Sequence, residues 1–287
     1  MCSPKLDIKI VDSYTTFRSN NKTAFIINGD SAHLPLPDNS VDAIVTDPPY
    51  FDFVHYSELS DFFYAWLRLA LQDSYQYFSQ GDSHHPGEVQ DRDPGKFSVQ
   101  LGLVFSECFR VLKEQGLMVF SFHHSKPDAW LAIYHAITTA QFMIAASHPV
   151  KAEMSVSKTK AATSNPINLD AIIVCKKQPQ QQPGKPLASE VWSTAYKRYH
   201  IYRERLRNAG RMLSNNDKYV ILSSQILVYA SCSRLNKPET QHLLERVYQL
   251  DFSHAEDLMN QGNREQSENF WKNQLVTAQT HFAFFHE

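Results

Sequence analysis

Short apolar runs alternate with segments of helical spacing through residues 1–177. Five apolar runs predict strands, at residues 24–28, 41–46, 117–122, 142–147 and 169–175. Three amphipathic segments predict helices, at residues 57–71, 99–113 and 127–139. Gly116 is expected to end the second helix. The alternation is typical of an α/β fold with a mainly parallel sheet covered on both faces, in which ligands bind at the carboxyl ends of the strands.

The pattern changes after residue 177. A Pro/Gln-rich stretch predicts a linker at residues 178–188. Beyond it the spacing is helical, at residues 191–212, 218–233 and 239–248, with a Gln/Asn-rich segment near residues 256–273. We therefore expect three regions: an α/β core (1–177), the linker, and a helical carboxyl-terminal region (189–287) that packs on the sheet as a small cap.

Composition narrows the class of protein without identifying a ligand. Apolar residues make up 43% and charged residues 20% of the chain, as in globular proteins. The net charge of -2 does not itself indicate a nucleic-acid binder, although a basic face can lie within a neutral total. The four cysteines form no CxxC pair and predict reduced thiols, and no apolar run reaches about 18 residues. The expectation is a cytoplasmic protein with no membrane span.

The tetrad Asp47-Pro48-Pro49-Tyr50 follows directly on the predicted strand at residues 41–46. A stiff Pro-Pro turn is the plain structural explanation. A chemical explanation starts from the exocyclic amine of adenine or cytosine, which is a poor nucleophile because its lone pair is delocalised into the ring. A carboxylate and a backbone carbonyl, each accepting one N–H, would hold the lone pair out of conjugation while a methyl donor lies in line.

Each residue of the tetrad has a place in that chemistry. Asp47 supplies the carboxylate, and the carbonyl of Pro48, held by the rigid turn, is the candidate second acceptor. Pro48 and Pro49 also remove N–H donors from the loop, so the loop presents acceptors to an amine. Tyr50 offers a flat ring on which a base flipped out of a duplex would stack, and Phe53 adds aromatic surface.

Polar pairs follow two other predicted strands. Asp30 and Ser31 come after the strand at 24–28, and Asp30 is a candidate acceptor for the adenine amino group of a nucleotide cofactor or, alternatively, the cap of a turn. His123 and His124 follow the strand at 117–122 and predict a contact to the target base or the phosphate backbone. The alternative is a solvent-exposed histidine pair. No metal site is expected there, because no other ligand has suitable spacing.

The stretch from Gly29 to Arg68 (GDSAHLPLPDNSVDAIVTDPPYFDFVHYSELSDFFYAWLR) resembles the core of S-adenosylmethionine-dependent amino-methyltransferases of the DPPY type. It most resembles a family of large prokaryotic adenine-specific DNA methylases, and similarity continues through FSECFRVLK, GLMVFSFHHSKPDAW, HPVKAEM and LDAIIVCK. The resemblance covers roughly residues 24–177. It implies a Rossmann-like methyltransferase sheet, a catalytic motif at Asp47 to Tyr50, and S-adenosyl-L-methionine contacts at Asp30 and Ser31.

One departure from the family concerns the Gly-rich loop that holds the methionine part of the cofactor. The chain has nine glycines, and the first is Gly29, so residues 1–28 do not supply this loop. We therefore expect a partial sheet that lacks the Gly-rich first strand unit. The chain resembles the carboxyl-terminal part of a larger enzyme, truncated or split, and an upstream polypeptide carrying the loop is its expected partner.

The expected nucleic-acid partner is DNA. Residues 196–211 contain six basic residues with Tyr196, Tyr199 and Tyr202 interleaved, which indicates either a phosphate-binding helix or a solvated amphipathic one. The main alternative to catalysis is an inactive fragment, or a nucleic-acid or partner-binding subunit, that needs a separate cofactor-binding half. RNA adenine is a further possible substrate, and cytosine remains open beside adenine.

Overall fold

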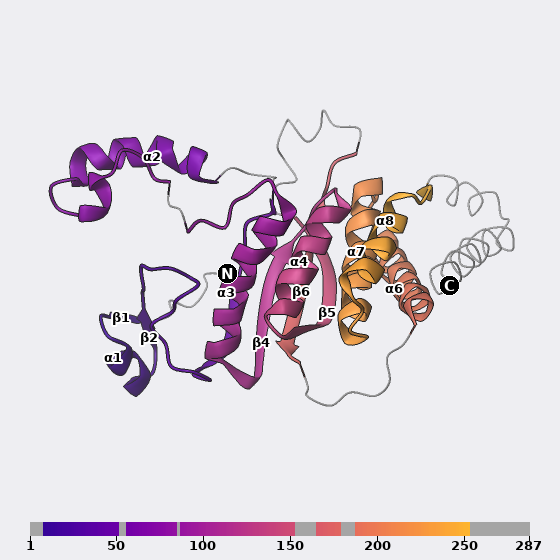
Figure 1. The fold of residues 1–287 in the computed structure, drawn as a ribbon, viewed down its shortest axis with the longest axis horizontal. Helices are drawn as coiled ribbons and strands as arrows, with labels where there is room; N and C mark the ends of the chain where they lie inside the picture. Colours follow the sequence, from indigo (N-terminus) through magenta and orange to yellow (C-terminus); the bar gives the residue numbers. More distant parts are fainter. Residues whose placement is uncertain (1–7, 52–55, 85–86, 153–164, 179–186, 253–287) are drawn as a thin grey trace, which may run out of the picture.

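The computed structural model describes residues 8–51, 56–84, 87–152, 165–178 and 187–252 (Figure 1). Its main sheet has the strand order β3-β4-β6-β5. The strands are β3 (Val41–Thr46), β4 (Leu112–Phe122), β5 (Phe142–Lys151) and β6 (Leu169–Lys177). β3 and β4 are parallel, whereas β6 is antiparallel to both β4 and β5. The fold is therefore α/β as expected, with three strands running in one direction and β6 inserted between two of them in reverse.

The expected mainly parallel pairing is therefore wrong for this sheet. Of its three neighbouring strand pairs, one is parallel and two are antiparallel. An apolar run shows that a strand is buried but does not encode its direction, and a strand that returns next to its predecessor reverses.

Helices α3 (Pro94–Val111) and α4 (Pro127–Thr139) cover one face of the sheet. Phe120 of β4 packs against Phe105 of α3 at 5.3 Å between ring centroids, and Phe122 packs against Trp130 of α4 at 5.1 Å. On the opposite face, residues of β4 and β6 such as Ile172 are only half-buried. Buried and half-buried residues alternate along β4 and β6, whereas a sheet covered on both faces would have continuously buried strands. The expected cover on both faces is therefore not found among the described residues.

The helical region lies against the β5 edge of the sheet (Figure 1). It comprises α6 (Ala188–Asn208), α7 (Asn215–Cys232) and α8 (Lys237–Tyr248). Helix α7 is buried on almost every side, and its side chains and those of the sheet belong to one hydrophobic cluster. The position agrees with a cap, while the division into domains stays a prediction. The predicted segment at residues 256–273 lies outside the described residues.

Both predicted boundaries of helix α3 are wrong. Helix α3 begins after Asp93, whose carboxylate accepts from the Lys96 N–H at 2.8 Å, and it ends at Val111 rather than at Gly116. Gly116 lies inside β4, where a Cβ atom would come within 2.6 Å of the Leu112 side chain and 3.0 Å of the Asp42 carbonyl oxygen. Crowding by the Leu112 side chain of the same strand and by the backbone of β3 therefore explains this glycine.

The amino-terminal segment forms a small sheet of its own. Strands β1 (Lys9–Val11) and β2 (Thr23–Phe25) are parallel and flank helix α1 (Tyr14–Ser19). The strand predicted at residues 24–28 is thus shorter than expected and does not join the main sheet.

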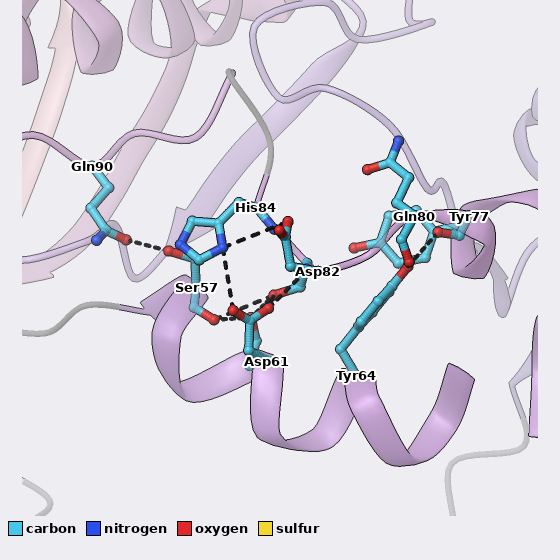
Figure 2. A network of polar contacts seen from close by, with 10 residues as sticks. Ser57, Asp61, Tyr64, Tyr77, Gln80, Asp82, His84 and Gln90 are labelled. Carbon is cyan, nitrogen blue, oxygen red and sulfur yellow. Dashed lines mark hydrogen bonds and ion pairs between the residues drawn. The ribbon is translucent and has the colours of Figure 1, made fainter. Parts of the chain in front are cut away.

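Helix α2 (Tyr56–Leu71) and the short helix η2 (Gln76–Ser79) form an arm beside the sheet (Figure 1). Asp61 accepts hydrogen bonds from the backbone N and the Oγ of Ser83 at 2.7 and 2.5 Å, and its carboxylate lies 3.3 Å from Nδ1 of His84 (Figure 2). The hydroxyl of Tyr64 donates to the carbonyls of Tyr77 and Gln80. These contacts tie the following loop to α2 and give the arm a fixed shape.

The outer side of α2 is apolar and exposed. Phe62, Phe63 and Trp66 are each 66% exposed. No helix in the described residues is both long enough and apolar enough to cross a membrane.

Candidate active site at the carboxyl ends of β3 and β4

Strand register brings the candidate site together. Thr46 of β3 pairs with Phe120 of β4, so the next residue of each strand, Asp47 and Ser121, lie side by side. In the same way Phe122 pairs with Ala171 of β6, and the adjoining residues His123 and Asp170 are in contact. Both contacts lie at the edge of the sheet where β3 and β4 end.

A directed chain of hydrogen bonds links the tetrad to β4. The Tyr50 hydroxyl donates to Oγ of Ser121 at 2.8 Å, and Ser121 donates to Oδ1 of Asp47. Burial raises the pKa of the Tyr50 phenol well above its ordinary value, and the charges of Asp170 and Asp47 raise it further, although the bond to Ser121 opposes them. The phenol therefore stays protonated at neutral pH and remains a hydrogen-bond donor.

His123 is held from two sides. Its Nδ1 is hydrogen-bonded to Asp170, and its ring meets the ring of Tyr50 edge-on, at 4.8 Å between centroids and an interplanar angle of 85°. His124 is buried as well, its carbonyl accepting from the indole N–H of Trp130 at 3.0 Å. The alternative of a solvent-exposed histidine pair is therefore wrong. A contact of either histidine with a base or phosphate stays a prediction.

The tetrad is anchored at its far end. Pro48 is buried, whereas Asp47 is exposed. Phe51 is buried and has a φ angle of 52°, in the left-handed region that bulky residues rarely adopt. Its ring packs against Phe97 of α3 at 5.4 Å and against His124 at 5.8 Å. The loop is thus fixed by packing on both sides. Phe53, predicted as a substrate contact, lies outside the described residues.

Asp30 and Ser31 lie in an exposed turn. The carboxylate of Asp30 accepts from the Ala32 N–H at 2.8 Å and lies 2.9 Å from Nδ1 of His33. These are the contacts of a turn-capping aspartate, the alternative considered for this residue. They do not bring Asp30 to the tetrad, and a cofactor contact at Asp30 and Ser31 stays a prediction.

Helix α3 holds the segment that leads from this turn to β3. The carboxylate of Glu107 accepts from the Leu34 N–H at 2.7 Å, while Arg110 donates to the Leu34 carbonyl and to Asp38. The bidentate pairing with Arg110 is the main reason that the pKa of Glu107 is lowered. These contacts of Glu107 and Arg110 fix the position at which β3 begins and therefore the position of the tetrad that follows it.

Two residues of the site, Ser121 and Asp170, belong to no recognisable motif. Ser121 interrupts an apolar strand (LMVFSF), and Asp170 stands at the start of another (LDAIIV). A polar residue inside or at the end of a buried strand is a usable signal, since it must find a partner. The partner of each, however, follows only from the register between strands about 50 to 70 residues apart.

The basic segment in α6 differs from its expected arrangement. Tyr196, Tyr199 and Tyr202 are buried, so they do not alternate with the basic residues on an open face. Arg203 is also buried. The exposed basic residues that remain on or just after the helix are Lys197, Arg205, Arg207 and Arg211. The helix is amphipathic, and whether its exposed basic residues bind phosphates stays a prediction.

The chain was compared with known proteins. No protein-family profile and no curated protein matches the sequence. Among solved structures, a DNA modification methylase from Thermus thermophilus is similar over 60% of this chain and 61% of its own, with 14% identity and a TM-score of 0.30. A SAM-dependent methyltransferase from Methanosarcina mazei is similar over 58% and 76%, with 14% identity and a TM-score of 0.28. The chain thus spans less than two thirds of the first structure's length, and the TM-scores are too low to carry a conclusion about chemistry.

Proposed function

We propose that this chain carries the target-amine half of an S-adenosylmethionine-dependent methyltransferase that acts on an exocyclic amino group of a DNA base, adenine N6. The observation that supports this most is the Asp47 carboxylate, which is exposed at the carboxyl end of β3 while one of its oxygens is held by Ser121. A carboxylate fixed in this way has a defined direction in which to accept an N–H.

The surrounding loop suits an amine. Ser121 donates to Oδ1 of Asp47, which leaves Oδ2 with room for a donor, and the carbonyl of Pro48 accepts no hydrogen bond within the described part of the chain. Two N–H groups of one amine can therefore meet two acceptors. Tyr50 is fixed in orientation by Ser121, His123 and Phe122, so that the exposed part of its ring is a candidate stacking surface for a flipped base.

The described residues do not by themselves form a site for the cofactor. Asp30 is engaged in a local turn, and the sequence has no glycine before Gly29 from which a loop for the methionine part could be built. When bound, S-adenosylmethionine would supply the methyl group. We propose that a second polypeptide with a Gly-rich strand–loop–helix unit supplies most of its contacts, and that Asp30 contributes to them.

A non-catalytic role is the second candidate, in which the chain binds nucleic acid or a partner but not the cofactor. The observation that favours it is the sheet itself, which has an unpaired outer edge at β3 and one half-covered face within the described residues. Calorimetric titration with S-adenosylmethionine, of the chain alone and with the upstream polypeptide, separates the two. Clear cofactor binding by the chain alone counts against the non-catalytic role, whereas binding by the mixture alone would not, because the upstream polypeptide is expected to bind the cofactor in either case.

Replacing Asp47 tests the proposed reaction. In the reconstituted pair, Asp47→Ala should reduce transfer of labelled methyl groups to DNA by about 10²-fold, since losing the amine acceptor removes on the order of 3 kcal/mol of transition-state stabilisation. DNA binding should be unchanged. Asp42→Ala removes a carboxylate from the other end of the same strand, where it pairs with Lys113 at 2.6 Å, and is the matched control.

Mass spectrometry of the digested product should show N6-methyladenine. N4-methylcytosine, or methylation of an RNA oligonucleotide instead of DNA, would change the substrate. Full activity of Asp47→Ala would show that the proposed mechanism is wrong.

A further inference from the structure

We propose that Ser121 is a positioning residue, which selects the side-chain rotamer of Asp47 and leaves a single carboxylate oxygen for the target amine. This inference rests on the proposed function, because Asp47 is the residue whose orientation it explains. It adds a residue of β4 to a site that the tetrad motif places on β3 alone.

The position of Ser121 is set by the sheet and not by a flexible loop. Its neighbours Phe120 and Phe122 are both buried, with 1% and 0% of their surface exposed, and they pack beneath α3 and α4. Since side chains alternate along a strand, Ser121 points to the opposite face and lies beside Asp47. A hydroxyl attached to so rigid a backbone constrains its acceptor more strongly than a loop residue would.

The direction of the hydrogen bonds follows from what each group can donate. A serine hydroxyl has one proton, and a carboxylate can only accept. Ser121 accepts from the Tyr50 hydroxyl at 2.8 Å and must therefore give its own proton to Asp47. The protonated phenol of Tyr50, by filling one acceptor position on Ser121, leaves the serine proton directed at the carboxylate.

The consequence for Asp47 is an asymmetric carboxylate. Oδ1 accepts the proton of Ser121, and the Tyr50 hydroxyl that donates to Ser121 also lies close enough to interact with the carboxylate. Asp47 is exposed, so that without Ser121 the side chain would exchange between rotamers in solvent. With Ser121 present, Oδ1 is held toward β4, which leaves Oδ2 as the oxygen that can accept a single N–H.

Two substitutions at Ser121 test the inference. Ser121→Ala removes the donor, and Ser121→Thr restores it on a residue that suits a strand. Ser106→Ala, which removes a hydroxyl bonded to the Gly102 carbonyl within α3, is the matched control. In single-turnover assays of the reconstituted pair we expect Ser121→Ala to lower the rate of methyl transfer about tenfold with DNA affinity within about twofold. Ser121→Thr and Ser106→Ala should stay near the wild-type rate.

A second measurement does not depend on catalysis. Three-bond couplings of Asp47 in selectively labelled protein report its χ1 populations, and they should show one rotamer in the wild type and in Ser121→Thr but averaging in Ser121→Ala. An unchanged Asp47 rotamer in Ser121→Ala would overturn the inference. If instead the rotamer responds but Asp47→Ala keeps full methyl-transfer activity, Ser121 does position Asp47 and the proposed function is wrong.

Discussion

The two edges of the main sheet differ in how their backbone groups are covered. At the β5 edge, the Ile144 N–H donates to Oγ of Ser231 at 2.8 Å, and the Ile144 carbonyl accepts from the Cys232 thiol. The Ser147 carbonyl accepts from both Gln225 and Tyr202 at 3.1 Å. At the β3 edge, no described strand pairs with the outer side of β3, and none of the residues of β3 is buried.

This difference is one of protection: one edge is covered within the described residues and the other is open. Edge strands expose a row of donors and acceptors that proteins usually cover or protect with charge. Helix α7 performs that task for β5, whereas β3 presents Val45 with 80% of its surface exposed. The tetrad follows directly on β3, so the open edge and the candidate site are neighbours. A partner that completed the sheet would therefore also be placed beside Asp47.

The largest expected loss of stability comes from truncating a side chain of α7, which covers the β5 edge. Leu227 of α7 is fully buried, and Leu227→Ala should lower the free energy of unfolding by about 2–5 kcal/mol, because the surrounding core cannot refill the cavity. Val45→Ala at the open edge is the matched truncation and should cost no more than about 0.5 kcal/mol. Urea denaturation followed by circular dichroism measures both. Equal losses would show that the two edges do not differ in the way described.

Acid should lower the stability of the fold through His200 of α6. Burial, with a smaller contribution from Arg203, lowers the pKa of His200 to about 4. Since the unfolded value is about 6.5, the unfolded chain binds a proton that the folded chain refuses, so stability is lost as the pH falls from about 6.5 to about 4. The loss due to His200 should be on the order of 3 kcal/mol and should be absent in His200→Gln, which keeps only the smaller slope of groups such as His135, whose pKa burial also lowers.

The matched control for that pH dependence is His33→Gln, on the exposed turn that precedes β3. The side chain of His33 is 83% exposed, and its removal should leave the acid slope in place. Urea denaturation at a series of pH values gives the slope. A slope in His200→Gln equal to that of the wild type would show that His200 is not its source.

The smallest effect on folding should come from a charge on the open edge. Val45→Lys should change the free energy of unfolding of the isolated chain by no more than about 0.5 kcal/mol, yet abolish association with the upstream polypeptide, because the ammonium group opposes strand addition. Leu69→Lys on α2, where the leucine is 73% exposed, is the control. Association of Val45→Lys with unchanged affinity, measured by calorimetry, would show that β3 is not the contact.

The sequence predicts the elements of this fold better than their arrangement. The bounds expected for β3 and α4 are confirmed, and α2 begins one residue earlier than expected. Periodicity records which side of an element is buried, and those segments have strong periodicity. It does not record strand direction, which is why the reversed β6 was not anticipated.

The same limit applies to the candidate site. The motif places Asp47 and Tyr50 at a strand end, and the structure agrees. Ser121 and Asp170 could not be assigned because their partners are fixed by register across the sheet. The roles predicted for Asp30, Ser31, Phe53, His123 and His124 remain predictions, since a role toward a ligand depends on groups outside this chain.

The left-handed backbone of Phe51 has a consequence for which sequences this loop tolerates. Glycine is the residue that relaxes such a backbone, but glycine would leave empty the space that the Phe51 ring fills between Phe97 and His124. Any other large apolar residue fills that space and keeps the unfavourable backbone. Position 51 thus faces two opposed demands that no single amino acid meets in full, and sequence variation there should be narrow even though the residue lies outside the tetrad.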